Sequence, residues 1–197
     1  MLPLPEVSWL QRDRHGAFIV TYPEIVSSDH IFDGKILSLR VDTLREPDGR
    51  TYTREVISYG KAVVLVPVAD DGRLLMVRQY RHAAGRWMLE LPAGGVDDRD
   101  HSPADAAQRE LREETGHRGT LTDIGGFFLA PGYSDEYQHI YAATDLVEDP
   151  LAHDEDEDLT LERVGLEEAL QLVAAGEICD AKSVAALLLY LRYTGRA

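Results

Sequence analysis

The sequence LPAGGVDDRDHSPADAAQRELREETGH, residues 91–117, decides the fold, because it places three carboxylates behind a glycine-rich turn. The carboxylates belong to Glu110, Glu113 and Glu114. Residues three and four positions apart share one face of a helix, so these side chains form one stripe. Like charges at this spacing repel by about a few tenths of a kcal/mol per pair, a cost that a bound hard cation removes.

The helix that carries this stripe has clear ends in the sequence. Ser102 is a good N-cap, Pro103 suits the first helical position, and Asp105 stands at the spacing of a capping box. Gly116 provides the left-handed residue that ends many helices. We expect the helix to begin at Pro103, after a turn at residues 92–95 whose backbone can approach a ligand closely.

The carboxylate stripe has two explanations. Carboxylate oxygens suit Mg²⁺, which takes one or two carboxylates and completes its coordination with waters and substrate phosphates. Zinc does not fit, since the sequence has no cluster of cysteine and histidine. The alternative is a solvated acidic helix, and the spacing of the carboxylates alone favours that alternative.

The surrounding motif changes this balance. The chain resembles the Nudix hydrolases, whose box is a glycine, five residues, a glutamate, seven residues, and then Arg-Glu-aliphatic-x-Glu-Glu-x-Gly. The second half of the box is intact here, as Arg109, Glu110, Leu111, Glu113, Glu114 and Gly116. The resemblance implies an α/β/α sandwich with a mixed sheet, and Mg²⁺ as cofactor with Mn²⁺ as an alternative.

The first half of the box departs from the family pattern. His101 stands where the family has its glutamate, with Asp100 beside it, and the loop has one extra residue if the family glycine is Gly94. In the family this glutamate mainly anchors the box arginine, so the resemblance gives Arg109 and His101 structural roles. We expect Asp100 or solvent to pair with Arg109.

Composition restricts the partners and the location. The chain of 197 residues has 35 acidic and 20 basic residues, a net charge of −15 that disfavours long nucleic acids but not a small phosphorylated molecule. The single cysteine, Cys179, excludes an internal disulfide, and no apolar run is long enough for a signal peptide or a membrane span. We expect a cytoplasmic enzyme without a membrane partner.

The N-terminal part of the chain, residues 1–59, is predicted to be separate from a Nudix domain at residues 60–197. Residues 1–15 have no period and are expected to form a loosely held arm. Strand-like segments then follow at residues 17–22, 35–46 and 50–60, with a hairpin turn at Pro47-Asp48-Gly49. In the Nudix members that the chain resembles, such a β region is exchanged between two subunits, which implies a homodimer.

Strand-like and helix-like segments alternate after residue 60. An apolar run at residues 62–68 predicts a central strand, and an Asp-Asp-Gly turn leads to a second strand at residues 73–80. The later segments are predicted as strands at 121–130, 139–146 and 159–165 and as helices at 166–175 and 181–193.

Two arginines, Arg78 and Arg81, flank the end of the second strand. A strand-end arginine is usually only a surface charge. The resemblance distinguishes Arg81, because family members with a matching Gln-x-Arg use that arginine on the substrate diphosphate, and the guanidinium fork suits phosphate geometry. Trp87 and Met88, which follow, are expected to pack in the core and at an interface rather than to contact a cofactor.

The loop PGYSDE at residues 131–136 narrows the resemblance to a subfamily. Nudix enzymes that hydrolyse ADP-ribose carry a proline about fifteen residues past the box, within a similar segment. The resemblance implies that Gly132 and Glu136 bind substrate, and that Arg54 from the N-terminal β region reaches the nucleotide. The alternative is an ordinary polar turn.

The acidic run DEDED at residues 154–158 is, by composition alone, a solvated loop. In ADP-ribose enzymes a similar loop supplies a glutamate to the site. The resemblance implies Glu155 as general base and Glu157 as a metal ligand, with the assignment between the two open. The remaining implied ligands are the Ala93 carbonyl, Glu110 and Glu114, and Glu113 binds a metal or orients its water.

The predicted reaction is hydrolysis of ADP-ribose to AMP and ribose 5-phosphate with Mg²⁺. One alternative is cleavage of another nucleotide sugar, such as GDP-mannose. Another is a sensor that binds ADP-ribose without cleaving it, for which His101 is the supporting feature. The aromatic residue that stacks on the base stays open among Tyr133, Tyr52 and Tyr59.

Overall fold

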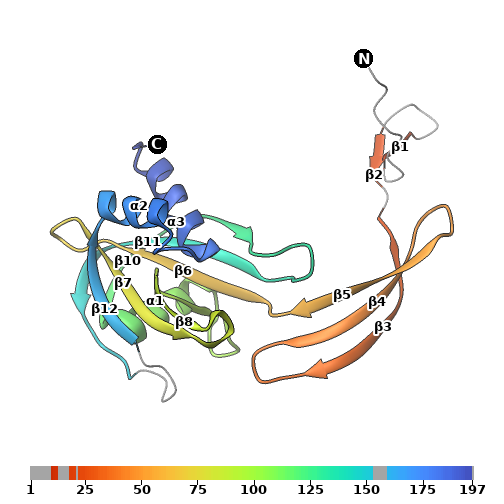
Figure 1. Ribbon diagram of the computed structural model, residues 1–197, viewed down its shortest axis with the longest axis horizontal. Helices are drawn as coiled ribbons and strands as arrows, with labels where there is room; N and C mark the ends of the chain where they lie inside the picture. The colour runs from red at the N-terminus through yellow and green to blue at the C-terminus, as the bar shows by residue number, and fades with distance from the viewer. Residues whose placement is uncertain (1–9, 13–17, 21, 153–158, 197) are drawn as a thin grey trace. The chain divides into compact units, whose positions relative to one another are not determined.

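The computed structural model describes residues 10–12, 18–20, 22–152 and 159–196 (Figure 1). The chain divides into two compact units. The first unit comprises residues 1–59 and 130–135, and the second comprises residues 60–129 and 136–197. Of the predicted arm, residues 1–9 and 13–15 lie outside the described ranges.

The first unit contains a three-stranded antiparallel sheet in the order β3-β4-β5. A short antiparallel pair of strands, β1 and β2, precedes it. The predicted turn between β4 and β5 is confirmed, with Gly49 at a positive φ of 89° and a hydrogen bond from Glu46 N to Arg50 O of 2.9 Å. The strands are β1 (Leu10–Arg12), β2 (Phe18–Val20), β3 (Glu24–Asp33), β4 (Ser38–Arg45) and β5 (Thr51–Ser58).

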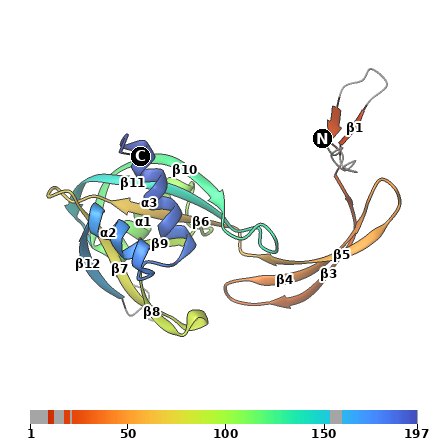
Figure 2. The same ribbon diagram turned by 45° about the horizontal axis from the view of Figure 1, so that its top comes forward.

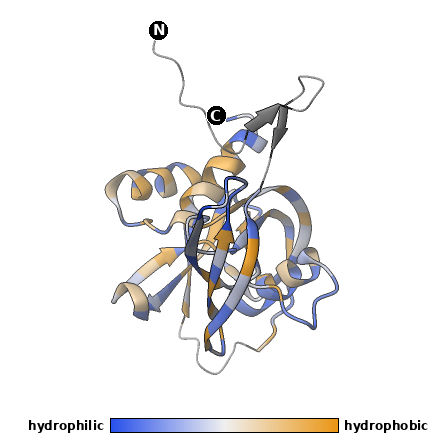
Figure 3. Ribbon diagram, turned by 90° about the vertical axis from the view of Figure 1, so that its right-hand side faces the viewer, coloured by the Kyte–Doolittle hydropathy of each residue, from blue (hydrophilic) through white to orange (hydrophobic). Residues whose placement is uncertain are grey.

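Strand β3 was not evident from the sequence. Its pairing with β4 shifts register between Ile25 and Ser27 and again between His30 and Phe32. Each shift reverses which side chains face each way, so the strand shows no steady alternation of polar and apolar residues. Figure 3 shows hydrophobic and hydrophilic residues interspersed along this sheet.

The second unit is built around β6, a strand of buried residues as its apolar run predicted. β6 lies within a sheet of order β10-β11-β6-β9, in which the β11-β6 pair is parallel and the other pairs are antiparallel. A second sheet has the order β12-β7-β8. The strands are β6 (Lys61–Pro67), β7 (Arg73–Arg81), β8 (Arg86–Glu90), β9 (Ala93–Gly95), β10 (His117–Phe128), β11 (Tyr137–Glu148) and β12 (Leu159–Gly165).

Helices cover both faces of the mixed sheet (Figures 1 and 2). Val63 and Leu65 of β6 pack with Leu111 of α1 in one buried cluster. The alternate residues Val64 and Val66 belong to the other buried cluster, which includes Leu187 of α3. The second unit is therefore an α/β/α sandwich with a mixed sheet, as predicted. The helices are α1 (Pro103–Thr115), α2 (Leu166–Ala175) and α3 (Ala181–Tyr193), with a 3₁₀ turn η1 (His82–Ala84).

The ends of α1 follow the sequence signals. The Ser102 hydroxyl accepts a hydrogen bond from the Asp105 N–H at 3.2 Å, and Pro103 is the first helical residue. Gly116 ends the helix in the left-handed region, at φ 72°. No helix in the described ranges is long and apolar enough to cross a membrane.

One local prediction was wrong. The expected turn at residues 92–95 includes a short strand, because Ala93, Gly94 and Gly95 pair with β6. Trp87 is exposed in this chain and makes an edge contact with Tyr80, which is also exposed, so packing of Trp87 at an interface stays a prediction. Met88 is buried as expected.

Candidate active site

Arg109 lies at the centre of the box on α1. Its Nη1 donates hydrogen bonds to Glu110 Oε1 at 2.6 Å and to Glu113 Oε2 at 2.9 Å. Its Nη2 donates to the Gly95 carbonyl at 2.9 Å. The guanidinium offsets the repulsion between the carboxylates and ties the helix to strand β9.

Asp100 completes the surroundings of Arg109. The guanidinium donates from Nε to Asp100 Oδ1 at 3.2 Å and from Nη2 to Oδ2 at 2.9 Å, a two-point pair. Hydrogen bonding to Arg109 lowers the pKa of the Asp100 carboxyl, against the opposing effect of burial. The expectation that Asp100 pairs with Arg109 is confirmed, whereas His101 is exposed.

Gly94 brings the backbone close to the box. A Cβ atom at residue 94 would overlap the Glu110 carboxylate, whereas a Cβ at Gly95 would meet open space. Gly94 is thus the glycine that the site needs for close approach. Asp100 lies six residues after Gly94, which is the family spacing from glycine to glutamate, so the extra residue of this chain lies between Asp100 and Arg109.

Glu110 and Glu114 are buried carboxylates, 8% and 3% exposed. Glu114 Oε2 accepts a hydrogen bond from the Ala93 N–H at 3.0 Å, which holds the carboxylate against β9. Carboxylate and carbonyl oxygens are ligands of Mg²⁺, so the donor chemistry fits a divalent cation. Among the described residues, no three side chains of His, Cys, Asp or Glu form a metal cluster. The predicted ligand Glu157 and the predicted base Glu155 lie outside the described residues.

Arg81 is held at the end of β7 by the buried carboxylate of Glu90, which is 1% exposed. Arg81 Nε donates to Glu90 Oε1 at 3.0 Å, and Nη2 donates to Oε2 at 2.7 Å. The hydrogen bonds with Glu90 raise the pKa of Arg81 against the opposing effect of burial, and the charge of Glu114 acts in the same direction. The predicted diphosphate-binding arginine and a box carboxylate thus lie within electrostatic reach of each other.

The start of β12 lies near the strand end that carries Arg81. Leu159, the first residue after the acidic run at residues 154–158, pairs with Gln79 of β7, two residues before Arg81. Arg78 and Glu162 form an ion pair further along the two strands, at 2.5 Å. Arg78 is therefore engaged in joining two strands, which agrees with a structural role for it.

Arg54 and Gly132 lie together in the first unit. They line a pocket of about 320 Å³ between β5 and the loop of residues 131–135, with Tyr133 and Asp42 also on its wall. The loop is tied to β5 by a hydrogen bond from Ile57 N to Tyr133 O at 2.8 Å. The Arg54 guanidinium stacks on the Tyr52 ring, 4.4 Å from its centroid. The structure thus groups two of the predicted substrate-binding residues.

Glu136 belongs to the second unit, at the start of β11. Its carboxylate accepts a hydrogen bond from Gln138 Nε2 at 2.5 Å. The Glu136 carbonyl also accepts a hydrogen bond from Leu129 N at 3.0 Å, which closes the base of the loop.

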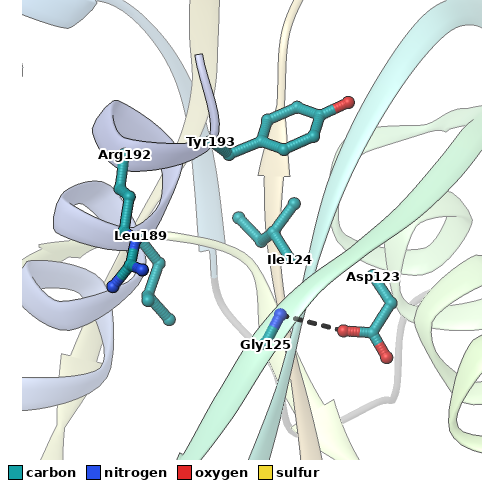
Figure 4. A pocket seen from close by; sticks show the side chains of 6 residues that line it. All are labelled: Asp123, Ile124, Gly125, Leu189, Arg192 and Tyr193. Carbon is teal, nitrogen blue, oxygen red and sulfur yellow. Dashed lines mark hydrogen bonds between the residues drawn. The ribbon is translucent and has the colours of Figure 1, made fainter. Parts of the chain in front are cut away.

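Another pocket, of about 510 Å³, contains none of the predicted site residues. It lies between β10 and the last turn of α3 (Figure 4). Figure 4 shows that Asp123 turns away from Tyr193, across the strand, where its carboxylate accepts a hydrogen bond from Gly125 N at 2.9 Å. This pocket is therefore not the candidate active site. Its lining residues are Asp123, Ile124, Gly125, Leu189, Arg192 and Tyr193.

Comparison with known proteins identifies the family. The family model described as NUDIX domain matches residues 58–187, so the chain belongs to the Nudix family and is a Nudix hydrolase. The model described as nucleoside diphosphate sugar hydrolase N-terminal domain matches residues 24–57. The second match covers the three-stranded sheet of the first unit almost completely.

Individual relatives agree with this placement. The chain is similar to an ADP-ribose pyrophosphatase of Mycobacterium tuberculosis, 41% identical over 84% of this chain and 81% of the relative. An ADP-ribose pyrophosphatase of Bacillus subtilis is 37% identical over 82% of this chain and 89% of the relative. The crystal structure of an ADP compounds hydrolase matches with a TM-score of 0.79 and 28% identity, covering 90% of this chain and 98% of that chain.

Glu90 and Lys182 were not among the residues predicted for the site. Lys182 donates a hydrogen bond to Glu90 Oε2 from the first turn of α3. A signal for Glu90 was present, because a single acidic residue stands within the apolar run WMLEL. A charge in such a run is almost never buried unless it is paired. The sequence held no equivalent signal for Lys182, which comes from a segment far along the chain.

Proposed function

We propose that this enzyme hydrolyses the diphosphate of ADP-ribose to AMP and ribose 5-phosphate. The observation that carries the proposal is the pair of relatives named ADP-ribose pyrophosphatase, whose similarity extends over 82% and 84% of this chain. The loop PGYSDE at residues 131–136 supports the same substrate, since it resembles the segment of ADP-ribose enzymes. The net charge of −15 disfavours long nucleic acids, and it leaves a small diphosphate possible as substrate.

Nudix hydrolases generally act with divalent metal ions. For this chain we assign Mg²⁺, with Mn²⁺ as the alternative, to the carboxylates of Glu110, Glu114 and Glu157 and to the carbonyl of Ala93. When bound, the metal supplies a Lewis acid for the phosphate oxygens and lowers the pKa of a bound water. Arg109 holds the Glu110 and Glu113 carboxylates in place.

Two further carboxylates act on the attacking water or on the metal. Glu155 accepts the proton of the attacking water as general base, and Glu113 orients a water or contributes a metal ligand. Support for Glu155 comes from its place in the chain, because β12 begins four residues later at Leu159, beside the strand end that carries Arg81.

The substrate is held by arginine and backbone groups. Arg81 binds the diphosphate, since its fork is fixed by Glu90 and its side chain is 40% exposed. Arg54 and Gly132 contact the nucleotide, with Tyr133 as the stacking residue, because all three line one pocket. Glu136, at the base of the same loop, contributes a carboxylate to substrate binding.

A homodimer belongs to the proposal. The first unit leaves large apolar side chains exposed along and after β3, which is unusual for a surface that contacts only water. They are Ile25, Val26, Ile31, Phe32 and Ile36. A second copy of the chain would cover them, with exchange of the N-terminal region. We further propose a cytoplasmic location, where the exposed free thiol of Cys179 stays reduced.

A substrate panel tests the proposal. The enzyme is incubated with ADP-ribose, GDP-mannose, ADP-glucose or NADH, with Mg²⁺ or with a chelator, and release of AMP or GMP is followed. The proposal predicts metal-dependent cleavage with the highest kcat/KM for ADP-ribose. Mn²⁺ in place of Mg²⁺ measures the metal preference.

Other outcomes point to the alternatives. A preference for GDP-mannose would retain the catalytic site but replace the substrate. Tight ADP-ribose binding without cleavage would indicate a sensor and would direct attention to His101. The intact Glu110, Glu113 and Glu114 favour cleavage over sensing.

A further inference from the structure

The Glu90 carboxylate pairs with two cationic side chains from different parts of the chain. It is 1% exposed and accepts hydrogen bonds from Arg81 at the end of β7 and from Lys182 in the first turn of α3. Burying a carboxylate is costly unless it is paired and hydrogen-bonded. The two-point contact with Arg81 already supplies Glu90 with an ion pair and hydrogen bonds. The presence of Lys182 as a second cation therefore needs a separate explanation.

Lys182 is itself fixed by the start of α3. Its Nζ donates to Asp180 Oδ2 at 2.9 Å, and the same oxygen accepts the Ser183 N–H at 2.9 Å as the N-cap of the helix. The Ser183 hydroxyl accepts a hydrogen bond from the buried Leu91 N–H at 2.8 Å. The first turn of α3 thus holds both the side chain of Glu90 and the backbone next to it.

Arg81 uses only part of its fork in this arrangement. Nε and Nη2 point to Glu90, and Nη1 has no hydrogen bond to any residue in the described part of the chain. Lys182 is only 13% exposed, so its ammonium cannot replace Arg81 at the surface. The lysine donates to Glu90 Oε2, the same oxygen that accepts Arg81 Nη2, but it comes from a different element of the fold.

We propose that Lys182 is a positioning residue, which fixes the Glu90 carboxylate and thereby aims the free edge of Arg81 at the substrate diphosphate. The inference rests on the proposed function, because it assigns Arg81 to the diphosphate. A carboxylate bonded to one arginine only can turn together with that arginine, whereas a carboxylate also bonded to a side chain of α3 is held in place. Through Lys182 and Glu90, helix α3 therefore fixes the orientation of the Arg81 guanidinium.

Kinetics of ADP-ribose hydrolysis test the inference through the charge of Lys182. Lys182→Met keeps the length of the side chain and removes its charge. We expect KM to rise about tenfold with kcat nearly unchanged, which is the pattern for loss of an interaction that binds substrate and transition state equally. Lys182→Arg keeps the charge and should recover most of the lost affinity. Lys61→Met, which removes an exposed lysine from the second unit, is the matched control and should leave KM unchanged.

A double mutant separates positioning from general stability. In an Arg81→Met background, Lys182→Met should change KM by less than about twofold, because Lys182 acts through Arg81. Full additivity of the two effects, or an unchanged KM in folded Lys182→Met, would overturn the inference. Thermal unfolding of each variant shows which of them are folded at the assay temperature.

A readout without substrate keeps this inference distinct from the proposed function. In NMR spectra, the Arg81 Nε–H signal is assigned by its loss in Arg81→Met. The Nε–H proton should exchange slowly with solvent in the wild type and faster in Lys182→Met. Unchanged exchange would contradict positioning by Lys182, whatever the substrate. Absence of ADP-ribose cleavage in the wild type would contradict only the proposed function.

Discussion

Gly94 determines where the Glu110 carboxylate can lie, because a side chain at residue 94 would occupy the same space. Gly94→Ala should therefore displace the Glu110 carboxylate, which can move at its flexible end, while the fold is kept. We expect turnover to fall by about a hundredfold, the scale of a misplacement near 1 Å. Gly95→Ala adds its methyl group to open space and is the matched control.

Metal-dependent turnover and thermal unfolding of the two glycine variants check this prediction. Equal activity in Gly94→Ala and Gly95→Ala would show that the close approach of Gly94 has no part in the site. A large loss of stability in Gly94→Ala would instead assign the glycine to folding.

Asp100 should stabilise the second unit through its pair with Arg109. Asp100→Asn removes one charge from a two-point pair, and we expect the free energy of unfolding at pH 7 to fall by about 1–3 kcal/mol. The folded-state pKa of Asp100 is lowered. Its contribution is therefore fully present above the unfolded pKa of about 4 and is lost as the pH falls through the lower folded value.

Denaturation of Asp100→Asn and the wild type between pH 7 and pH 2 measures this difference. The gap between them should narrow below pH 4, while exposed Asp98→Asn follows the wild type throughout. A gap that persists at pH 2 would mean that the charge of Asp100 is not the source of the stability.

At the scale of elements, the acidic segment before β12 contains two candidate residues, Glu155 and Glu157. The sequence left open which of them is the general base and which is a metal ligand. Glu155→Gln should lower kcat by at least about a hundredfold if Glu155 is the general base. Glu157→Gln should instead raise the metal concentration needed for half-maximal rate. Metal titrations of both variants decide between them, and the reverse pattern would exchange the two roles.

Elements with local signals were predictable from the sequence. The ends of α1 follow from Ser102, Pro103 and Gly116, because caps act through adjacent backbone groups. Strand β6 follows from its continuous apolar run. By contrast, β3 is interrupted by two register shifts, and β9 is a short strand formed by pairing with β6, so neither leaves a periodic pattern.

The residues of the candidate site likewise fall into those with a local sequence signal and those without one. Glu110 and Glu114 were predictable because they share one helix and one motif. The pairing of Arg81 with Glu90 depends on how β7 meets β8, and the contact of Lys182 with Glu90 spans 92 positions of the chain. Contacts between distant segments are set by the whole fold and leave no local trace in a single sequence.

At the scale of the whole molecule, the exposed apolar residues of β3 predict dimerisation. Ile31 lies at a register shift without a partner on β4, so Ile31→Asp should disturb the sheet little. A charge buried without a partner should weaken the dimer by at least about thirtyfold. Val147→Asp, at an exposed position of β11 in the second unit, is the control.

Light scattering over a range of protein concentrations measures the change in assembly. The wild type and Val147→Asp should be dimers at concentrations where Ile31→Asp is monomeric. A monomeric wild type would remove the explanation offered for the exposed apolar residues.

The central claim, that the box carboxylates of this chain support metal-dependent hydrolysis, is tested most directly with Glu114→Gln. The substitution removes one charge but keeps an oxygen that can accept the Ala93 N–H, so the fold should be retained. We predict that AMP release from ADP-ribose with Mg²⁺ is abolished, while exposed Glu167→Gln matches the wild type. Near wild-type AMP release by Glu114→Gln at low Mg²⁺ would contradict the assignment of the active site.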